Sequence, residues 1–176
     1  LVVVDGETRD DEWPFGDGRV FPAGPMREPL KAGLARADAA VLLLPADLTL
    51  ADPELVHALS AVPVLSAHLA AAAAPPKGPQ VGFAGIGKPW KVERALKAAG
   101  CDLADFAPFA DHAAYDAATL QRLADRATVF SAGLVTTEKD WVRLPPDWRA
   151  RVTPWPVQAV FDDDAALDAL LERAGL

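Results

Sequence analysis

Short apolar runs alternate along the chain with amphipathic stretches, which predicts strands alternating with helices. Strands are expected at residues 1–5, 41–44, 62–65, 80–84, 103–109, 132–136 and 157–161. Continuous apolar runs such as 41–44 are typical of parallel strands that are covered on both faces. The alternation therefore predicts an α/β fold with a mainly parallel sheet and helices on both faces.

Helix starts are marked by capping residues. Asp52 precedes Pro53 and Glu54, which is the usual order of a cap, a proline in the first turn and an early acid. Asp116 and Asp164 are expected to cap two later helices, and further helices are expected at about 30–37 and 89–99. The apolar positions of the two capped helices fall on one face each: Leu120, Leu123, Ala124 and Ala127, and then Leu167, Leu170 and Leu171. The Ala/Pro/Gly-rich stretch at 70–79 is expected to be a linker.

Composition narrows the class of protein. The 176 residues are 51% hydrophobic and 24% charged, with a formal net charge of -8. This acidity argues against a nucleic-acid-binding protein, which needs a basic face. The single cysteine, Cys101, excludes an internal disulfide and is expected to be a small buried residue. The sequence contains no run long and apolar enough to span a bilayer and no signal peptide, which favours a soluble cytoplasmic protein.

The stretch from Val20 to Leu30 contains three prolines and a glycine within nine residues, and it carries the adjacent pair Arg27-Glu28. Proline fixes φ and removes amide donors, so this segment presents its side chains from a stiff backbone. Arginine offers a planar fork suited to phosphate, and glutamate offers oxygens suited to a hard cation such as Mg²⁺. The alternative is a proline-rich connector with a surface ion pair.

The segment Gly82 to Lys88 matches the phosphate loop G-x-x-x-x-G-K up to its last position. That position is Pro89, which has neither the hydroxyl that would bind Mg²⁺ nor an amide hydrogen. A packed strand-to-helix turn with Pro89 at the helix start is the favoured interpretation. An ATP loop is the alternative, and free amides there would suit an anion.

Asp111 and His112 follow the expected strand at 103–109 and precede a capped helix. Open α/β sheets bind their ligands at this edge, and a histidine oriented by a carboxylate can take a proton from a hydroxyl. The alternative is a helix cap or a surface pair.

A strand end runs into dense charge at Thr136-Thr137-Glu138-Lys139-Asp140-Trp141-Val142-Arg143-Leu144. These polar groups have the reach to contact a ligand. A turn held by local hydrogen bonds and ion pairs explains them equally well.

Together these segments resemble the tetraacyldisaccharide 4′-kinases, which phosphorylate the lipid A precursor in Gram-negative bacteria. The matching segments are 2–5, 15–19 with 22–29, 85–89, 109–115 and 136–144, in the family's order. Three positions depart from the family pattern. The family usually has Asn where Asp17 stands, often has Asn at Lys88, and commonly has Pro at Ala110.

The resemblance implies a two-lobed enzyme that uses ATP and Mg²⁺. Residues 1–50 would be the tail of a P-loop kinase lobe, 60–150 a smaller C-terminal α/β lobe, and 160–176 a helix that returns to the first lobe. Arg27 and Glu28 are implied to lie at the nucleotide, with Glu28 also at the metal. His112 is implied to activate the 4′-hydroxyl, with Asp111 orienting it or placing the substrate.

The resemblance also implies the protein's substrate and its location at a membrane. The substrate would be the lipid A disaccharide precursor at the cytoplasmic face of the inner membrane. The phosphate loop, the metal motif, the carboxylate that pairs with His112 and the membrane contact would all lie upstream of Leu1. We therefore expect this chain alone to be an inactive C-terminal portion. Two alternatives are a non-catalytic module that binds a phosphorylated glycolipid or a partner protein, and a nucleotide-sugar enzyme that uses the Gly82–Gly87 loop.

Overall fold

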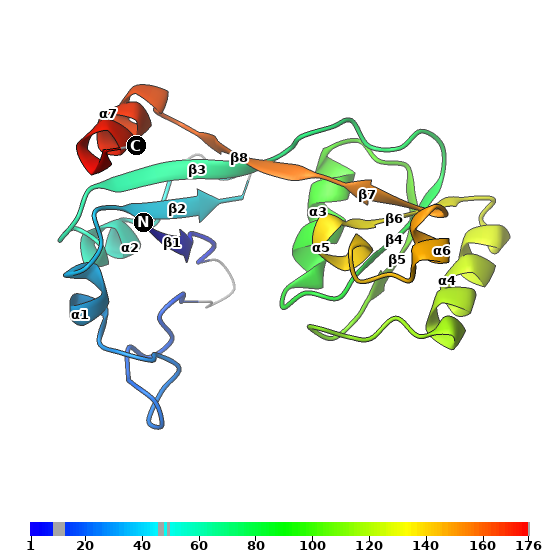
Figure 1. The fold of residues 1–176 in the computed structure, drawn as a ribbon, viewed down its shortest axis with the longest axis horizontal. Helices are drawn as coiled ribbons and strands as arrows, with labels where there is room; N and C mark the ends of the chain where they lie inside the picture. Colours follow the sequence, from blue (N-terminus) through cyan, green and yellow to red (C-terminus); the bar gives the residue numbers. More distant parts are fainter. Residues whose placement is uncertain (9–12, 46–47, 49, 176) are drawn as a thin grey trace. The chain divides into compact units, whose positions relative to one another are not determined.

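A computed structural model describes residues 1–8, 13–45, 48 and 50–175 of the chain. The chain divides into two compact units (Figure 1). The first comprises Leu1–Ala70 and Ala159–Leu176, and the second comprises Ala71–Gln158. That these units correspond to the two lobes implied by the resemblance remains a proposal.

Seven elements are found in the described residues of the first unit. They are β1 (Val2–Asp5), α1 (Leu30–Leu34), β2 (Ala40–Leu44), α2 (Pro53–Ala58), β3 (Val64–Ala71), β8 (Val157–Phe161) and α7 (Asp164–Ala174). The sheet order is β1-β2-β3-β8, and β1, β2 and β3 pair in parallel. One core cluster packs β1 and β2 against α1 and α2 through Val4, Leu42, Leu34 and Leu55.

Eight elements build the second unit. They are β4 (Gln80–Ala84), α3 (Pro89–Ala98), β5 (Leu103–Pro108), α4 (Ala117–Val129), β6 (Gly133–Thr137), α5 (Glu138–Trp141), α6 (Pro146–Arg149) and β7 (Val152–Trp155). The sheet order is β5-β4-β6-β7, and every ladder in it is parallel. The α/β fold with a mainly parallel sheet is therefore confirmed.

The second sheet is covered on both faces, as expected (Figure 1). Val81 and Phe83 in β4 join the core cluster that includes Leu120 and Leu123 of α4. The other face packs Leu96 of α3 in a second cluster. Side chains alternate along a strand, so one apolar run can serve both cores. Burial on both faces explains why the strand sequences are continuous rather than alternating.

Several expected boundaries are confirmed by the structure. The Asp52 carboxylate accepts the amide hydrogen of Glu54 at 2.8 Å, and Asp116 accepts that of Thr119 at 2.7 Å. Cys101 is buried, and burial raises the pKa of its thiol.

Other expectations need correction. The last helix is capped by Asp163 instead of Asp164, because the Asp163 carboxylate accepts the Ala166 amide hydrogen at 2.9 Å. The strand expected at 62–65 runs over Val64–Ala71 and takes up the start of the expected linker. Strand β7 was not predicted because it contains Pro154, which a strand tolerates at a sheet edge.

Candidate functional site

The loop that follows β5 holds His112 in an unusual backbone conformation. His112 has φ +58°, in the left-handed region that few residues other than glycine adopt. Ser131 has a positive φ too, but it follows the end of α4, where left-handed residues commonly end helices. His112 stands at the third position of a turn that the Ala113 amide closes on the Ala110 carbonyl, where several turn types take a positive φ. Histidine is among the residues other than glycine that adopt this region most often, and such positions gather at functional sites.

Backbone hydrogen bonds fix this loop while the imidazole stays open to solvent. The His112 amide donates to the Gly85 carbonyl at 3.2 Å, and the Ala113 amide donates to the Ala110 carbonyl at 3.0 Å. The His112 side chain is 73% exposed. The imidazole of His112 therefore faces solvent, while its backbone is hydrogen-bonded to Gly85 at the end of β4.

Asp111 lies beside the imidazole and is itself next to a lysine. Asp111 Oδ2 is 3.7 Å from His112 Nε2, an ion-pair separation that is longer than a hydrogen bond. Lys139 Nζ of α5 is 3.8 Å from Asp111 Oδ1. Asp111 and His112 are thus brought together as expected, and Lys139 joins them. Lys139 was missed as a site residue, although the dense charge after β6 was the signal that contained it.

The turn between β4 and α3 is packed, and its backbone is already engaged. The Gly85 amide donates to Asp140 Oδ2 at 3.0 Å. A Cβ on Gly85 would stand 2.7 Å from the Tyr115 hydroxyl and 3.3 Å from the Ala110 carbonyl oxygen. Pro89 begins α3, as the packed-turn interpretation predicts. An amide that donates to Asp140 is not available to cradle a phosphate.

A buried carboxylate organises the residues around this turn. Asp140 is fully buried, and its Oδ2 also accepts the Thr137 hydroxyl at 2.9 Å. Its Oδ1 lies 3.1 Å from Arg143 Nη1. The Arg143 guanidinium further donates to the carbonyls of Gly85, at 3.3 Å, and of Ala113. A buried ion pair is tolerated when further hydrogen bonds satisfy it, as they do here.

Three aromatic rings pack together at the two ends of the Asp111–His112 loop and on β4. Phe83, Phe109 and Tyr115 form three edge-on contacts, with ring centroids 5.4 to 6.4 Å apart. The Arg143 guanidinium lies 5.5 Å from the Tyr115 ring centroid. Burial, together with the Asp140 carboxylate, raises the pKa of the Tyr115 hydroxyl. That hydroxyl has no hydrogen-bond partner of good geometry among the described residues, although Asp140 is near.

Arg27 and Glu28 lie in the first unit and differ in their availability. Both Glu28 carboxylate oxygens accept from the Arg36 guanidinium, at 2.6 and 2.8 Å, and this pairing lowers the pKa of Glu28. Arg27 is exposed and makes no side-chain hydrogen bond or ion pair within the described part of the chain. Arg27 can therefore bind a phosphate without breaking an existing interaction, whereas Glu28 would have to leave Arg36 to bind a metal ion.

Neither unit holds a ready metal site among the residues described. No group of three or more His, Cys, Asp or Glu side chains there is arranged to hold a metal ion. Glu28 supplies a single carboxylate that is already paired with Arg36. The described residues thus form no all-protein metal cage, whereas a Mg²⁺ ion bound to nucleotide phosphates needs only one or two carboxylates.

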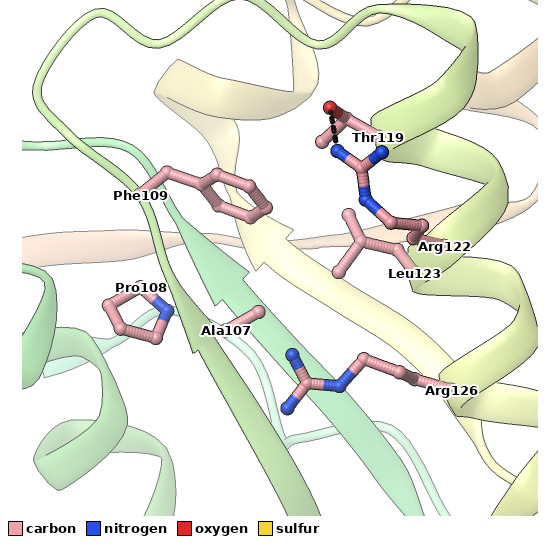
Figure 2. A pocket seen from close by; sticks show the side chains of 7 residues that line it. All are labelled: Ala107, Pro108, Phe109, Thr119, Arg122, Leu123 and Arg126. Carbon is pink, nitrogen blue, oxygen red and sulfur yellow. Dashed lines mark hydrogen bonds between the residues drawn. The ribbon is translucent and has the colours of Figure 1, made fainter.

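A groove of about 220 Å³ lies between the end of β5 and α4 (Figure 2). Both arginines that line it already make polar contacts. Arg126 Nε lies 2.7 Å from Asp105 Oδ2, and Arg122 donates to the Thr119 hydroxyl at 2.8 Å. Phe109 lines the groove and also contacts the aromatic rings below the loop. The groove contains none of the site residues that the sequence predicted.

No helix in the described ranges is long and apolar enough to cross a membrane.

Comparison with known proteins finds one family. A family model described as "Tetraacyldisaccharide-1-P 4'-kinase" matches residues 1–175. A tetraacyldisaccharide 4'-kinase of Phenylobacterium zucineum is 75% identical over 171 residues, which are 97% of this chain and 52% of that protein. A tetraacyldisaccharide 4'-kinase of Caulobacter vibrioides is 72% identical over 176 residues, which are 100% of this chain and 52% of that protein. The chain thus spans about half the length of these relatives.

A solved structure shares the fold. It is titled as LpxK from Aquifex aeolicus in complex with ATP, and its TM-score is 0.58 at 23% identity. The match covers 89% of this chain and 48% of that one. The match of the family model over nearly every residue, together with these close relatives, shows that this chain belongs to the tetraacyldisaccharide-1-P 4'-kinase family.

Proposed function

We propose that the protein containing this chain transfers the terminal phosphoryl group of ATP to the 4′-hydroxyl of a tetraacyldisaccharide 1-phosphate, a lipid A precursor. The family supplies the reaction class. The single observation in this chain that carries the proposal is His112, an exposed imidazole on a left-handed turn residue whose backbone is held by hydrogen bonds. A fixed, solvent-facing imidazole suits a general base.

In the proposed reaction His112 takes the proton of the 4′-hydroxyl. The 4′-oxygen forms a bond to the γ-phosphorus, the bond from phosphorus to the β,γ-bridging oxygen breaks, and ADP leaves with that electron pair. Asp111, whose Oδ2 lies 3.7 Å from His112 Nε2, orients the imidazole or helps to place the sugar. Catalysis of this kind depends mainly on positioning and on neutralising phosphoryl charge.

We assign Arg27 to the phosphate groups of ATP, because its planar fork is exposed and unpaired within the described chain. Bound Mg²⁺ would supply further neutralisation of phosphate oxygens. Glu28 remains the proposed residue for nucleotide or metal, but it would first have to release Arg36. No step of the reaction depends on it here.

We also propose that the enzyme works at the cytoplasmic face of the inner membrane, where its acylated substrate lies, and that nucleic acid is not a partner. The net charge of -8 supports the second part. A second candidate function is a non-catalytic module that binds a phosphorylated glycolipid or a partner protein through the exposed Asp111–His112 face.

The test is ATP-dependent phosphorylation of tetraacyldisaccharide 1-phosphate by the protein expressed from its complete gene. His112→Ala is expected to lower kcat about 10²–10⁴-fold, the usual contribution of a general base, with ATP affinity unchanged. Equal losses of turnover and ATP affinity would assign His112 to nucleotide binding or to the fold. Glycolipid binding without any turnover by the parent protein would favour the second candidate.

A further inference from the structure

We propose that Asp140 and Arg143 are positioning residues that hold His112 in its left-handed conformation. The segment 136–144, which the sequence left without an assigned role, thereby becomes part of the catalytic machinery without touching substrate. The effect on turnover rests on the proposed function, whereas the effect on the loop does not.

The geometry links Arg143 to the backbone at His112 through two carbonyls. Nη1 donates to the Gly85 carbonyl, which also accepts the His112 amide hydrogen at 3.2 Å. Nη2 donates to the carbonyl of Ala113, the residue that follows His112. One guanidinium thus holds the carbonyl directly after the histidine and the carbonyl that accepts the histidine's own amide hydrogen.

Asp140 fixes the other end of this arrangement. Its carboxylate holds Arg143 Nη1 at 3.1 Å and the Gly85 amide at 3.0 Å, so the turn and the guanidinium share one anchor. Thr137 caps α5 through the Asp140 amide at 3.0 Å, which fixes the carboxylate relative to the end of β6. This one ion pair joins residues that lie 30 to 58 positions apart in the sequence.

The chemistry requires arginine. Only a guanidinium presents donors in a rigid fork that can reach Asp140, Gly85 and Ala113 together, whereas lysine offers a single ammonium. Lysine would keep a positive charge opposite Asp140 but would lose the hydrogen bond to at least one of the two carbonyls. A left-handed histidine with fewer restraints will relax toward ordinary φ values.

The matched control is the pair Arg126 and Asp105 in the same unit. It joins α4 to β5 through a contact of 2.7 Å, and neither residue contacts the Asp111–His112 loop. Arg126→Lys therefore makes the same chemical change as Arg143→Lys, away from the site.

The first measurement is amide hydrogen exchange at His112 and Ala113 in the protein expressed from its complete gene. Arg143→Lys is expected to speed exchange of these two amides at least tenfold, whereas Arg126→Lys leaves them unchanged. Exchange elsewhere in α4 and β4 reports whether the fold is intact. Unchanged exchange at His112 in folded Arg143→Lys overturns the proposal.

The second measurement is turnover. Arg143→Lys is expected to lower kcat about tenfold or more with KM for ATP unchanged, and to lower it no further when His112 is already alanine. A loss of the same size in the His112→Ala background would show that Arg143 acts elsewhere, and would overturn the proposal. If the parent protein has no turnover, the proposed function fails, and hydrogen exchange alone decides the positioning role.

Discussion

The amide of Gly85 donates a hydrogen bond to the buried carboxylate of Asp140, 55 residues later in the chain, at 3.0 Å. This bond joins the turn after β4 to the segment after β6. The carbonyl of the same glycine accepts the His112 amide hydrogen. Gly85 is therefore the point where the two segments meet the loop that presents the proposed base.

Gly85→Ala is expected to destabilise the protein by about 1–3 kcal/mol, as overpacking does. The new methyl group would lie 2.7 Å from the Tyr115 hydroxyl, within a packed turn. Gly87→Ala is the control, because its Cβ would meet nothing closer than Asp111 Oδ2 at 4.0 Å. Urea unfolding of the two variants measures the difference. Equal stability would show that the turn can open without cost.

Asp140→Asn is expected to cost about 3–5 kcal/mol, because it leaves the Arg143 charge without its buried partner. Asp105→Asn removes the partner of Arg126 at a more exposed site and is expected to cost about 1 kcal/mol or less. Chemical denaturation of both variants tests the contrast. A loss at Asp140 no larger than at Asp105 would mean that the buried pair contributes little.

Tyr115→Phe is expected to change stability by less than about 1 kcal/mol, because the lost hydroxyl has no well-formed hydrogen bond among the described residues. The ring keeps its contacts with Phe83 and Phe109. Tyr115→Ala removes those contacts too and is expected to cost about 3–5 kcal/mol. Thermal unfolding distinguishes the two variants. A large loss in Tyr115→Phe would reveal a bond from the hydroxyl to Asp140.

His68 is expected to make the first unit less stable as the pH rises above neutrality. Its ring nitrogens contact the Leu48 carbonyl at 2.9 Å and Asp162 Oδ1 at 2.8 Å. Both contacts raise the pKa of His68, and the hydrogen bond to the Leu48 carbonyl has the larger effect. A raised pKa in the folded state gives stability that is complete below the unfolded value of about 6.5 and is lost as pH rises through the folded value.

The measurement is the free energy of unfolding between pH 5 and pH 9, with His68→Gln as the comparison. The glutamine variant is expected to lose this part of the pH dependence. An NMR titration of the imidazole checks the direction of the shift. A pKa at or below the usual value would contradict the assignment.

Local patterns were sufficient for most of the fold. Asp52 and Asp116 cap their helices as the sequence predicts, because a cap depends on residues two or three positions away. The difference between Asp163 and Asp164 was not readable, since adjacent aspartates offer the same chemistry and only the backbone angles select one. Strand β7 was missed because pairing at a sheet edge overrides the low strand propensity of proline.

The candidate site divides in the same way. The sequence by itself predicted that an Asp-His pair would lie between a strand and a capped helix of an α/β fold, because strand ends and helix caps are local signals. Only the tertiary structure showed that His112 adopts a left-handed conformation and that Asp140 and Arg143 hold the neighbouring backbone at Gly85 and Ala113. The ion pair and its bonds to Gly85 and Ala113 depend on segments 30 to 58 residues apart meeting in space, and no local pattern records such a meeting.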